Sequence, residues 1–340
     1  MSIQETNLKA IADAIRAKLG TTGTIKASEF ASKIAAIQSG IAKPEWKQTT
    51  LPTSVVWGDI CYGGGKFVAI AGGQHYDYNV AAYSTDGINW TQTTLPTSAK
   101  WITVCYGGGK FVAIAYGSSV AAYSTDGINW TQTTLPGSRS WRSVCYGNGK
   151  FVAIAYGSTL PAYSADGITW SSGRMPSNAY WYSVCYGAGK FVAVAWNNTI
   201  AAYSTDGINW TQATLPTSAK WTTVCYGNGR FVTVGYDSTI TAYSTDGINW
   251  TQTALPTTTS TTDPNSWSGM CYGNGKFVLV PYYYLIPTYW SVDGINWNPS
   301  TTVPNSNWNG PAYGNGVFAV LGGNQTNRAA YLKDSFDEWE

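Results

Sequence analysis

The feature that most constrains the fold is a unit of about 40 residues that recurs along most of the chain. The tripeptide CYG begins at six positions, which are Cys61, Cys105, Cys145, Cys185, Cys225 and Cys271, and a seventh unit has AYG from Ala312. The stretch YSTDGINWTQ occurs four times unchanged, from Tyr83, Tyr123, Tyr203 and Tyr243, with looser forms from Tyr163 and Trp290. Seven similar units in one chain predict a repeat architecture.

Each unit is expected to contain four short strands. In the unit from Trp101 to Pro136, WITVCYG and FVAIAYG flank a GGK turn, and AAYS and WTQTTLP flank TDGIN. The runs are rich in Val, Ile, Tyr and Thr and are bounded by Gly, Asp, Asn or Pro, which is typical of strands. Four antiparallel strands per 40 residues describe one propeller blade. We therefore predict an all-β, seven-bladed β-propeller over residues 41–340.

The two ends of the chain predict how the ring closes. The segment EWKQTTLP from Glu45 matches the fourth strand of a unit, but no first three strands precede it. The C-terminal AAYLKDSFDEWE supplies a third strand and a turn and then ends. The N-terminal strand should therefore complete the last blade, which removes an exposed edge prone to aggregation.

The TDGIN turn is expected to serve the scaffold. Asp accepts hydrogen bonds from backbone amides ahead of it, and Gly tolerates positive φ. Ser84, Asp86, Gly87 and Trp90 resemble the Asp box of sialidase-type propellers, Ser-x-Asp-x-Gly-x-x-Trp, with one residue fewer between Asp and Gly. That resemblance implies a folding element remote from any catalytic centre. The six cysteines are likewise expected to be small core side chains.

Composition favours a neutral polar ligand. Only 11% of residues are charged, 15% are aromatic, and the net charge is +2. No run of Lys or Arg is present, so capture of nucleic acid is not supported, and no apolar run is long enough to insert into a membrane. Sugars are the first such ligands to consider. We expect no cofactor, and a structural metal ion on the propeller axis remains an open alternative.

The units differ most in the segments that precede the first strand, follow its Trp, or join strands two and three. Blade topology places these segments on one face, and binding residues concentrate on loops held by a rigid scaffold. Drift on an unused surface is the alternative. The predicted ligand-binding residues are His75, Tyr76, Tyr78, Arg139, Arg142, Tyr180, Tyr182, Trp196, Asn197, Asp237, Tyr282, Tyr283 and Tyr284. Aromatic rings cover the apolar face of a pyranose, and Asn, Asp and Arg bind its hydroxyls.

The sequence contains few residues in the arrangements that catalysis requires, so we predict that the protein is not an enzyme. A glycosidase needs paired carboxylates, but Glu occurs only at positions 5, 29, 45, 338 and 340, outside the predicted blade cores. Most Asp residues belong to the repeated turns. The single histidine, His75, has no triad partner that the sequence identifies.

Residues 1–40 predict a short two-helix module. Leu8, Ile11, Ile15 and Leu19 share one face of the first helix, and Phe30, Ile34 and Ile37 one face of the second. The segment resembles short helical modules that recur in tail proteins of phages and prophages. The resemblance implies attachment to other tail proteins or oligomerisation, and a location on a virion tail. The N-terminus lacks a signal-peptide core, so we expect synthesis in the host cytoplasm.

These observations predict a non-enzymatic, lectin-like adhesin: a phage or prophage tail fibre component whose variable face binds a glycan, or a surface protein, of a bacterial host. The alternatives are a structural or protein-binding propeller of a tail assembly and, third, an Asp-box glycan hydrolase.

Overall fold

The computed structural model describes residues 12–13, 15–17, 45–256, 266–283, 286–304 and 306–333. The chain divides into two compact units, one of residues 1–44 with 334–340 and one spanning Glu45–Lys333. The predicted two-helix module lies almost entirely outside the described residues. The five residues described there have helical backbone, and Arg16 pairs with Asp13.

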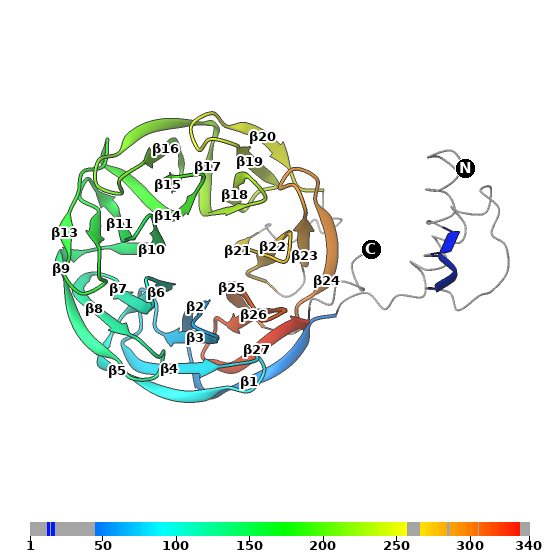
Figure 1. Ribbon diagram of the computed structural model, residues 1–340, viewed down its shortest axis with the longest axis horizontal. Helices are drawn as coiled ribbons and strands as arrows, with labels where there is room; N and C mark the ends of the chain where they lie inside the picture. Colours follow the sequence, from blue (N-terminus) through cyan, green and yellow to red (C-terminus); the bar gives the residue numbers. More distant parts are fainter. Residues whose placement is uncertain are drawn as a thin grey trace. The chain divides into compact units, whose positions relative to one another are not determined.

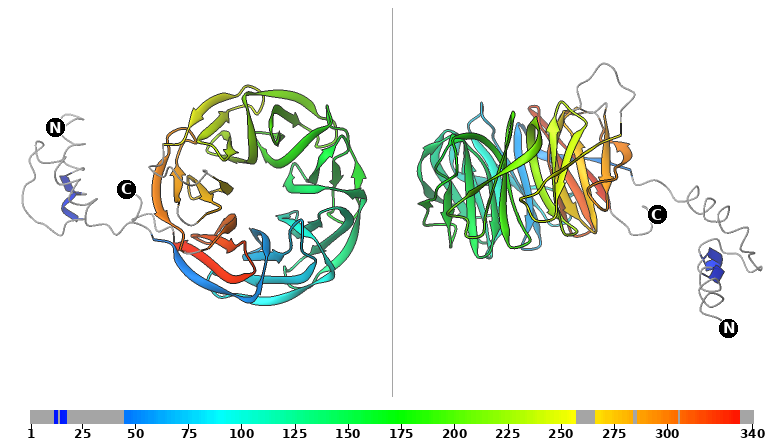
Figure 2. Two further views of the ribbon diagram at one scale, coloured as in Figure 1. Left: turned by 180° about the vertical axis from the view of Figure 1, so that it is seen from behind. Right: turned by 90° about the horizontal axis from the view of Figure 1, so that it is seen from above.

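The described residues of the second unit form a ring of seven four-stranded antiparallel blades (Figure 1). Seen edge-on, the ring is a disc whose strands run through its thickness (Figure 2). From the axis outwards, blade 1 consists of β2 (Trp57–Gly63), β3 (Lys66–Ala71), β4 (Tyr78–Ser84) and β5 (Thr91–Ala99). Blade 2 consists of β6 (Trp101–Gly107), β7 (Lys110–Ala115), β8 (Ser118–Ser124) and β9 (Thr131–Arg139).

The next three blades join into one continuous sheet. Blade 3 consists of β10 (Trp141–Gly147), β11 (Lys150–Ser158), β12 (Ala162–Ser164) and β13 (Ser171–Ser172). Blade 4 consists of β14 (Ala179–Gly187), β15 (Lys190–Ala195), β16 (Asn198–Ser204) and the first half of β17 (Thr211–Gly227). Blade 5 consists of the second half of β17, β18 (Arg230–Tyr236), β19 (Ile240–Ser244) and β20 (Thr251–Ala254).

The last two blades complete the ring. Blade 6 consists of β21 (Trp267–Gly273), β22 (Lys276–Pro281), β23 (Pro287–Ser291) and β24 (Asn298–Thr302). Blade 7 consists of β25 (Trp308–Gly314), β26 (Val317–Gly322), β27 (Thr326–Lys333) and β1 (Lys47–Val55). Strand β1 pairs with β27 in antiparallel register, with Lys47 opposite Tyr331 and Thr50 opposite Arg328. The predicted closure by the N-terminal strand is thus confirmed.

The core lies between neighbouring blades. The second strand of each blade is almost continuously buried, because its two faces are covered by the blades on either side. The Trp at or near the start of each innermost strand segment is at most 2% exposed in all seven blades. In six of them its Nε1 donates to a backbone oxygen, as Trp101 does to Thr97 at 3.2 Å. These Trp residues therefore pack the blades and offer no free ring to a ligand.

The TDGIN turns have the predicted geometry. In blade 1, Asp86 Oδ1 accepts hydrogen bonds from the backbone N–H of Ile88 at 2.9 Å and of Asn89 at 2.8 Å. Gly87 has φ of 71°, a value that favours glycine. The same contacts recur at Asp126, Asp166, Asp206, Asp246 and Asp293. The repeated stretch is therefore a folding element.

One prediction about the variable face is wrong. The segments before each innermost Trp were expected to be loops, but in several blades they continue the outermost strand. In blade 2, Arg139 at the end of β9 pairs with Ser118 at the start of β8. In β17 the chain runs from blade 4 to blade 5 as one 17-residue strand. The pairing satisfies backbone groups that a loop would leave to water.

Candidate functional site

The candidate site is built on a β-bulge that occurs near the Trp of the innermost strand in every blade. In blades 1 to 6 the register between the first two strands shifts directly after the innermost Trp, and in blade 7 one residue later. A bulge adds one unpaired residue and re-aims its side chain. The bulged residues are Gly58, Ile102, Arg142, Tyr182, Thr222, Ser268 and Gly310.

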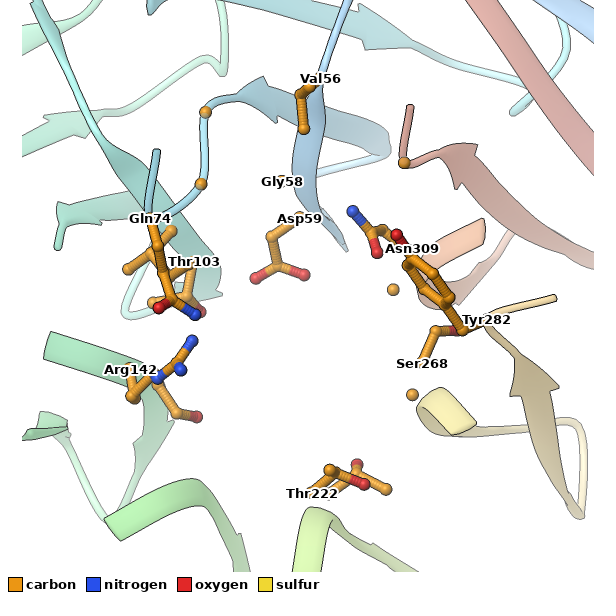
Figure 3. A pocket seen from close by; sticks show the side chains of 18 of the residues that line it. Val56, Gly58, Asp59, Gln74, Thr103, Arg142, Thr222, Ser268, Tyr282 and Asn309 are labelled. Atoms are coloured by element: carbon orange, nitrogen blue, oxygen red, sulfur yellow. The ribbon is translucent and has the colours of Figure 1, made fainter. Parts of the chain in front are cut away.

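All seven bulged residues line one cavity of about 930 Å³ on the propeller axis (Figure 3). Its wall is mostly uncharged and polar. The lining side chains include Gln74, Thr103, Ser143, Ser183, Thr223 and Asn309. Asp59, His75 and Arg142 are the ionisable groups of the lining other than tyrosines. Each of the seven blades therefore contributes its bulged residue to the cavity, and these seven residues are of six different types.

Arg142 is held by aromatic rings and an amide. Its guanidinium carbon lies 4.5 Å from the ring centroid of Tyr182, 5.6 Å from Tyr116 and 5.8 Å from Tyr156. With its carboxamide oxygen toward Arg142, Gln74 accepts hydrogen bonds from both Nη atoms at 2.5 and 2.6 Å. Figure 3 shows the two side chains facing each other at the cavity wall. A cation held on several ring faces is fixed in position and partly dehydrated.

The aromatic cluster extends across blades 3 to 5. Tyr182 stacks on Trp196 with centroids 5.1 Å apart, and Trp196 lies 5.5 Å from Tyr236. Tyr156, which also contacts Arg142, stacks on Tyr180 with ring centroids 4.4 Å apart. Tyr180 is 50% exposed and so presents one free ring edge or face to solvent. This row of rings is the part of the variable face best suited to contact an apolar ligand surface.

Asp59 at the cavity wall joins two blades. Its Oδ1 accepts from Ile60 N and its Oδ2 from Val104 N in blade 2, both at 2.9 Å. Burial raises the pKa of Asp59 to about 6, although hydrogen bonds from Val104, Ile60 and Thr103 oppose the increase. Ser143 and Ser183 occupy the equivalent position and accept from Val184 N and Val224 N. This position therefore connects neighbouring blades and also lines the cavity, beside the bulged residue that precedes it.

The structure brings five of the predicted site residues to the cavity: His75, Tyr76, Arg142, Tyr182 and Tyr282. Three others lie beside it in ring stacks, namely Tyr78 on Tyr76, Tyr180 on Tyr156 and Trp196 on Tyr182. In blade 6 it is Tyr282 that lines the cavity; Tyr283 does not, and Tyr284 lies outside the described residues. Arg139 is also absent from the lining and covers the Trp141 ring at 5.3 Å.

Asn197 and Asp237 have a backbone role that the sequence did not reveal. Both have positive φ, 55° and 54°, where blades 2 and 3 have Gly117 and Gly157. Asn and Asp are the side chains that best tolerate this conformation. Asp237 also pairs with Lys220 at 3.1 Å and accepts from Ser266 at 2.7 Å. Turn geometry thus explains these two residues, and neither lines the cavity.

Several lining residues were missed because their types are unremarkable or repeated. Gln74, Thr222, Ser268 and Asn309 were passed over as ordinary polar residues. Outside the lining, Tyr116 and Tyr156 contact Arg142, and Tyr236 contacts Trp196. These tyrosines recur at one position in three blades and so resembled scaffold. The position directly after each innermost Trp is the signal that would have found the bulged residues, whatever their type.

The six cysteines are free and half-buried. Burial raises the pKa of each thiol, to about 12 for Cys225, so reactive thiolates are scarce at neutral pH. Within the described ranges, no group of three or more His, Cys, Asp or Glu could hold a metal ion. In the same part of the chain, no helix could span a membrane.

The ring of four-stranded blades around an axial cavity defines a β-propeller. No known family profile and no curated protein matches the sequence. Among solved structures, a streptogramin B lyase aligns with a TM-score of 0.72 at 13% identity, covering 85% of this chain and 97% of that one. A catalytically inactive virginiamycin B lyase from Staphylococcus aureus with quinupristin aligns at 0.72 and 12%, covering 85% and 99%.

A third solved structure, YCF48 bound to D1 peptide, aligns with a TM-score of 0.63 at 16% identity, covering 87% of this chain and 98% of that one. At these identities the likeness shows the fold alone. The resemblances to Asp-box propellers and to phage tail modules stay predictions.

Proposed function

We propose that the protein is a non-enzymatic, lectin-like propeller that binds a host-surface glycan in its axial cavity. The observation that carries the proposal is the ring of seven bulged residues. The strands and the TDGIN turns repeat closely in most blades, yet Gly58, Ile102, Arg142, Tyr182, Thr222 and Ser268 differ where they face one cavity of about 930 Å³. A cavity of this size accommodates a drug-sized molecule or a short oligosaccharide.

The chemistry of the lining suits a sugar. Gln74, Thr222, Ser268 and Asn309 supply neutral donors and acceptors for hydroxyl groups. Tyr76, which is 38% exposed, and Tyr182 supply rings for the C–H face of a pyranose. Both kinds of group converge from different blades, so a ligand would contact several blades at once. We therefore propose one binding site shared by several blades. Near-identical blades would otherwise each be expected to provide a separate weak site.

Binding without turnover is proposed because the carboxylate of the lining is already engaged. Asp59 holds two backbone N–H groups of neighbouring strands, and an acid or base in that position would have to release them. The location on a phage tail rests on the resemblance of residues 1–40 alone. Immunogold labelling of purified particles with antibody to the propeller tests it, and labelled tails are the expected result.

The experiment that tests the binding proposal is a glycan array probed with full-length protein, followed by analysis of each bound glycan for cleavage. We expect selective binding of uncleaved glycan. Cleavage would show an enzyme. A blank array would favour a protein-binding or structural propeller, and a pull-down with the full-length chain would follow.

A double variant ties the binding to the cavity. Arg142→Ala with Tyr182→Ala should reduce glycan binding at least tenfold with the melting temperature nearly unchanged. A large fall in melting temperature with binding intact would show that these side chains serve packing.

A further inference from the structure

The charge distribution of the cavity points to the class of glycan. We infer that the ligand is acidic and that its carboxylate or sulfate group binds to Arg142; this inference rests on the proposed glycan-binding function. Within the described part of the chain, no carboxylate forms an ion pair with Arg142. A half-buried cation without a counter-ion is costly unless a partner is supplied.

The contacts of Arg142 position it for an incoming anion. Three rings, those of Tyr116, Tyr156 and Tyr182, surround the guanidinium, so its orientation is set before the ligand arrives. Its one hydrogen-bond acceptor among the described residues is the neutral amide of Gln74. A guanidinium has five N–H donors in a planar fork that matches a carboxylate. A ligand carboxylate would take the Nη–H groups that Gln74 leaves unpaired or displace the weaker amide oxygen.

The carboxylate of the same cavity does not neutralise Arg142. Both oxygens of Asp59 accept hydrogen bonds from backbone amides of β2 and β6. Figure 3 shows Gln74 and Thr103 lying between Asp59 and Arg142 along the wall. His75 is the remaining ionisable group besides tyrosines. The positive end of the cavity is therefore at blade 3, and an ionised Asp59 would direct an anion toward it.

The test is an array on which each acidic oligosaccharide stands beside a neutral counterpart. Examples are 3′-sialyllactose beside lactose and oligogalacturonate beside its carboxyl-reduced form. For the wild-type chain in 20 mM salt, we expect acidic members to bind at least tenfold more tightly. In 500 mM salt the preference should shrink several-fold, because ion pairs are screened. Equal or tighter binding of neutral members would overturn this inference and leave the glycan proposal standing; binding to neither overturns both.

Matched arginine variants locate the anion. Arg142→Gln should abolish the acidic preference, so that acidic and neutral members bind alike. Arg142→Lys should retain part of the preference, since lysine keeps the charge but not the fork. Arg139→Gln removes the same charge three residues away, from a side chain that covers Trp141 outside the cavity lining. It should leave the preference intact. An acidic preference that survives Arg142→Gln would overturn the inference.

Discussion

The ring of Tyr62 in blade 1 occupies the space that a Cβ at Gly314 in blade 7 would need. The same relationship joins each blade to the next, because the Tyr after each cysteine position packs on the Gly that ends the preceding innermost strand. The other six pairs are Gly63 with Tyr106, Gly107 with Tyr146, Gly147 with Tyr186, Gly187 with Tyr226, Gly227 with Tyr272 and Gly273 with Tyr313. Seven such contacts close the ring around its axis.

Substituting the glycine of this contact should destabilise the closed ring. Gly314→Ala adds a methyl group where the Tyr62 ring lies, and overpacking of this kind costs about 1–3 kcal/mol. We expect a lower urea midpoint and a melting temperature lower by several degrees. Gly64→Asn is the control, because Asn148 and Asn228 occupy the equivalent turn position with similar φ. Equal stability of Gly314→Ala and wild type would contradict the packing argument.

The repeated turns should make the fold sensitive to acid. Partial burial raises the pKa of Asp86, but hydrogen bonds from Asn89, Ile88 and Ser84 outweigh it and hold the pKa at about 2. A carboxyl group whose pKa is lower in the folded chain stabilises it above the unfolded value of 3.8, and this stabilisation is lost as the pH falls toward 2. The free energy of unfolding should therefore drop steeply between about pH 4 and pH 2.

Asp126→Asn tests the origin of that slope. The pKa of Asp126 is also held well below its usual value by hydrogen bonds that outweigh burial. The variant should be less stable at pH 7, but its stability should change less between pH 4 and pH 2. Ligand selectivity should stay the same, since the turn lies outside the cavity lining. Parallel pH profiles for the two proteins would assign the acid sensitivity to other groups.

Ionisation of Asp59 should lower the stability of the fold, whereas ionisation of the turn aspartates raises it. Because its folded pKa is about 6 against 3.8 in the unfolded chain, ionisation destabilises the fold as the pH rises from about 4 to 6, by at most about 3 kcal/mol. Asp59→Asn should remove this decline, so urea midpoints at pH 4.5 and pH 7 should become more alike. A wild-type midpoint that rises between those two pH values, unchanged in the variant, would refute the prediction.

Filling the cavity should block binding without disturbing the fold. Thr222→Trp places a large ring at a bulge that faces the cavity, so glycan binding should fall at least tenfold while the melting temperature stays within a few degrees. Thr94→Trp is the matched control, because Thr94 is exposed on the outer strand β5. Unimpaired binding by Thr222→Trp would place the ligand elsewhere.

Much of the fold follows from local sequence. The blade number, the Asp86-type turns and the closing strand β1 were predicted because each depends on periodicity or turn chemistry within one unit. Five of the predicted binding residues also line the cavity, since they lie in segments where the units differ. The backbone role of Asn197 and Asp237 was not predicted, because a positive φ is not visible in the sequence when the side chain is one that also binds sugars.

The sequence by itself therefore determined a ring of seven repeated blades and the face on which they vary. Only the tertiary structure decided which variable residues meet. Arg142 and Gln74 are 68 positions apart, and their contact depends on a bulge in blade 3 and on the segment that joins β3 to β4 in blade 1. The spacing of residues in the sequence predicts which residues are neighbours within a strand or a turn. A cavity on the propeller axis is lined by residues from every blade. These residues come close to one another only when the ring is closed.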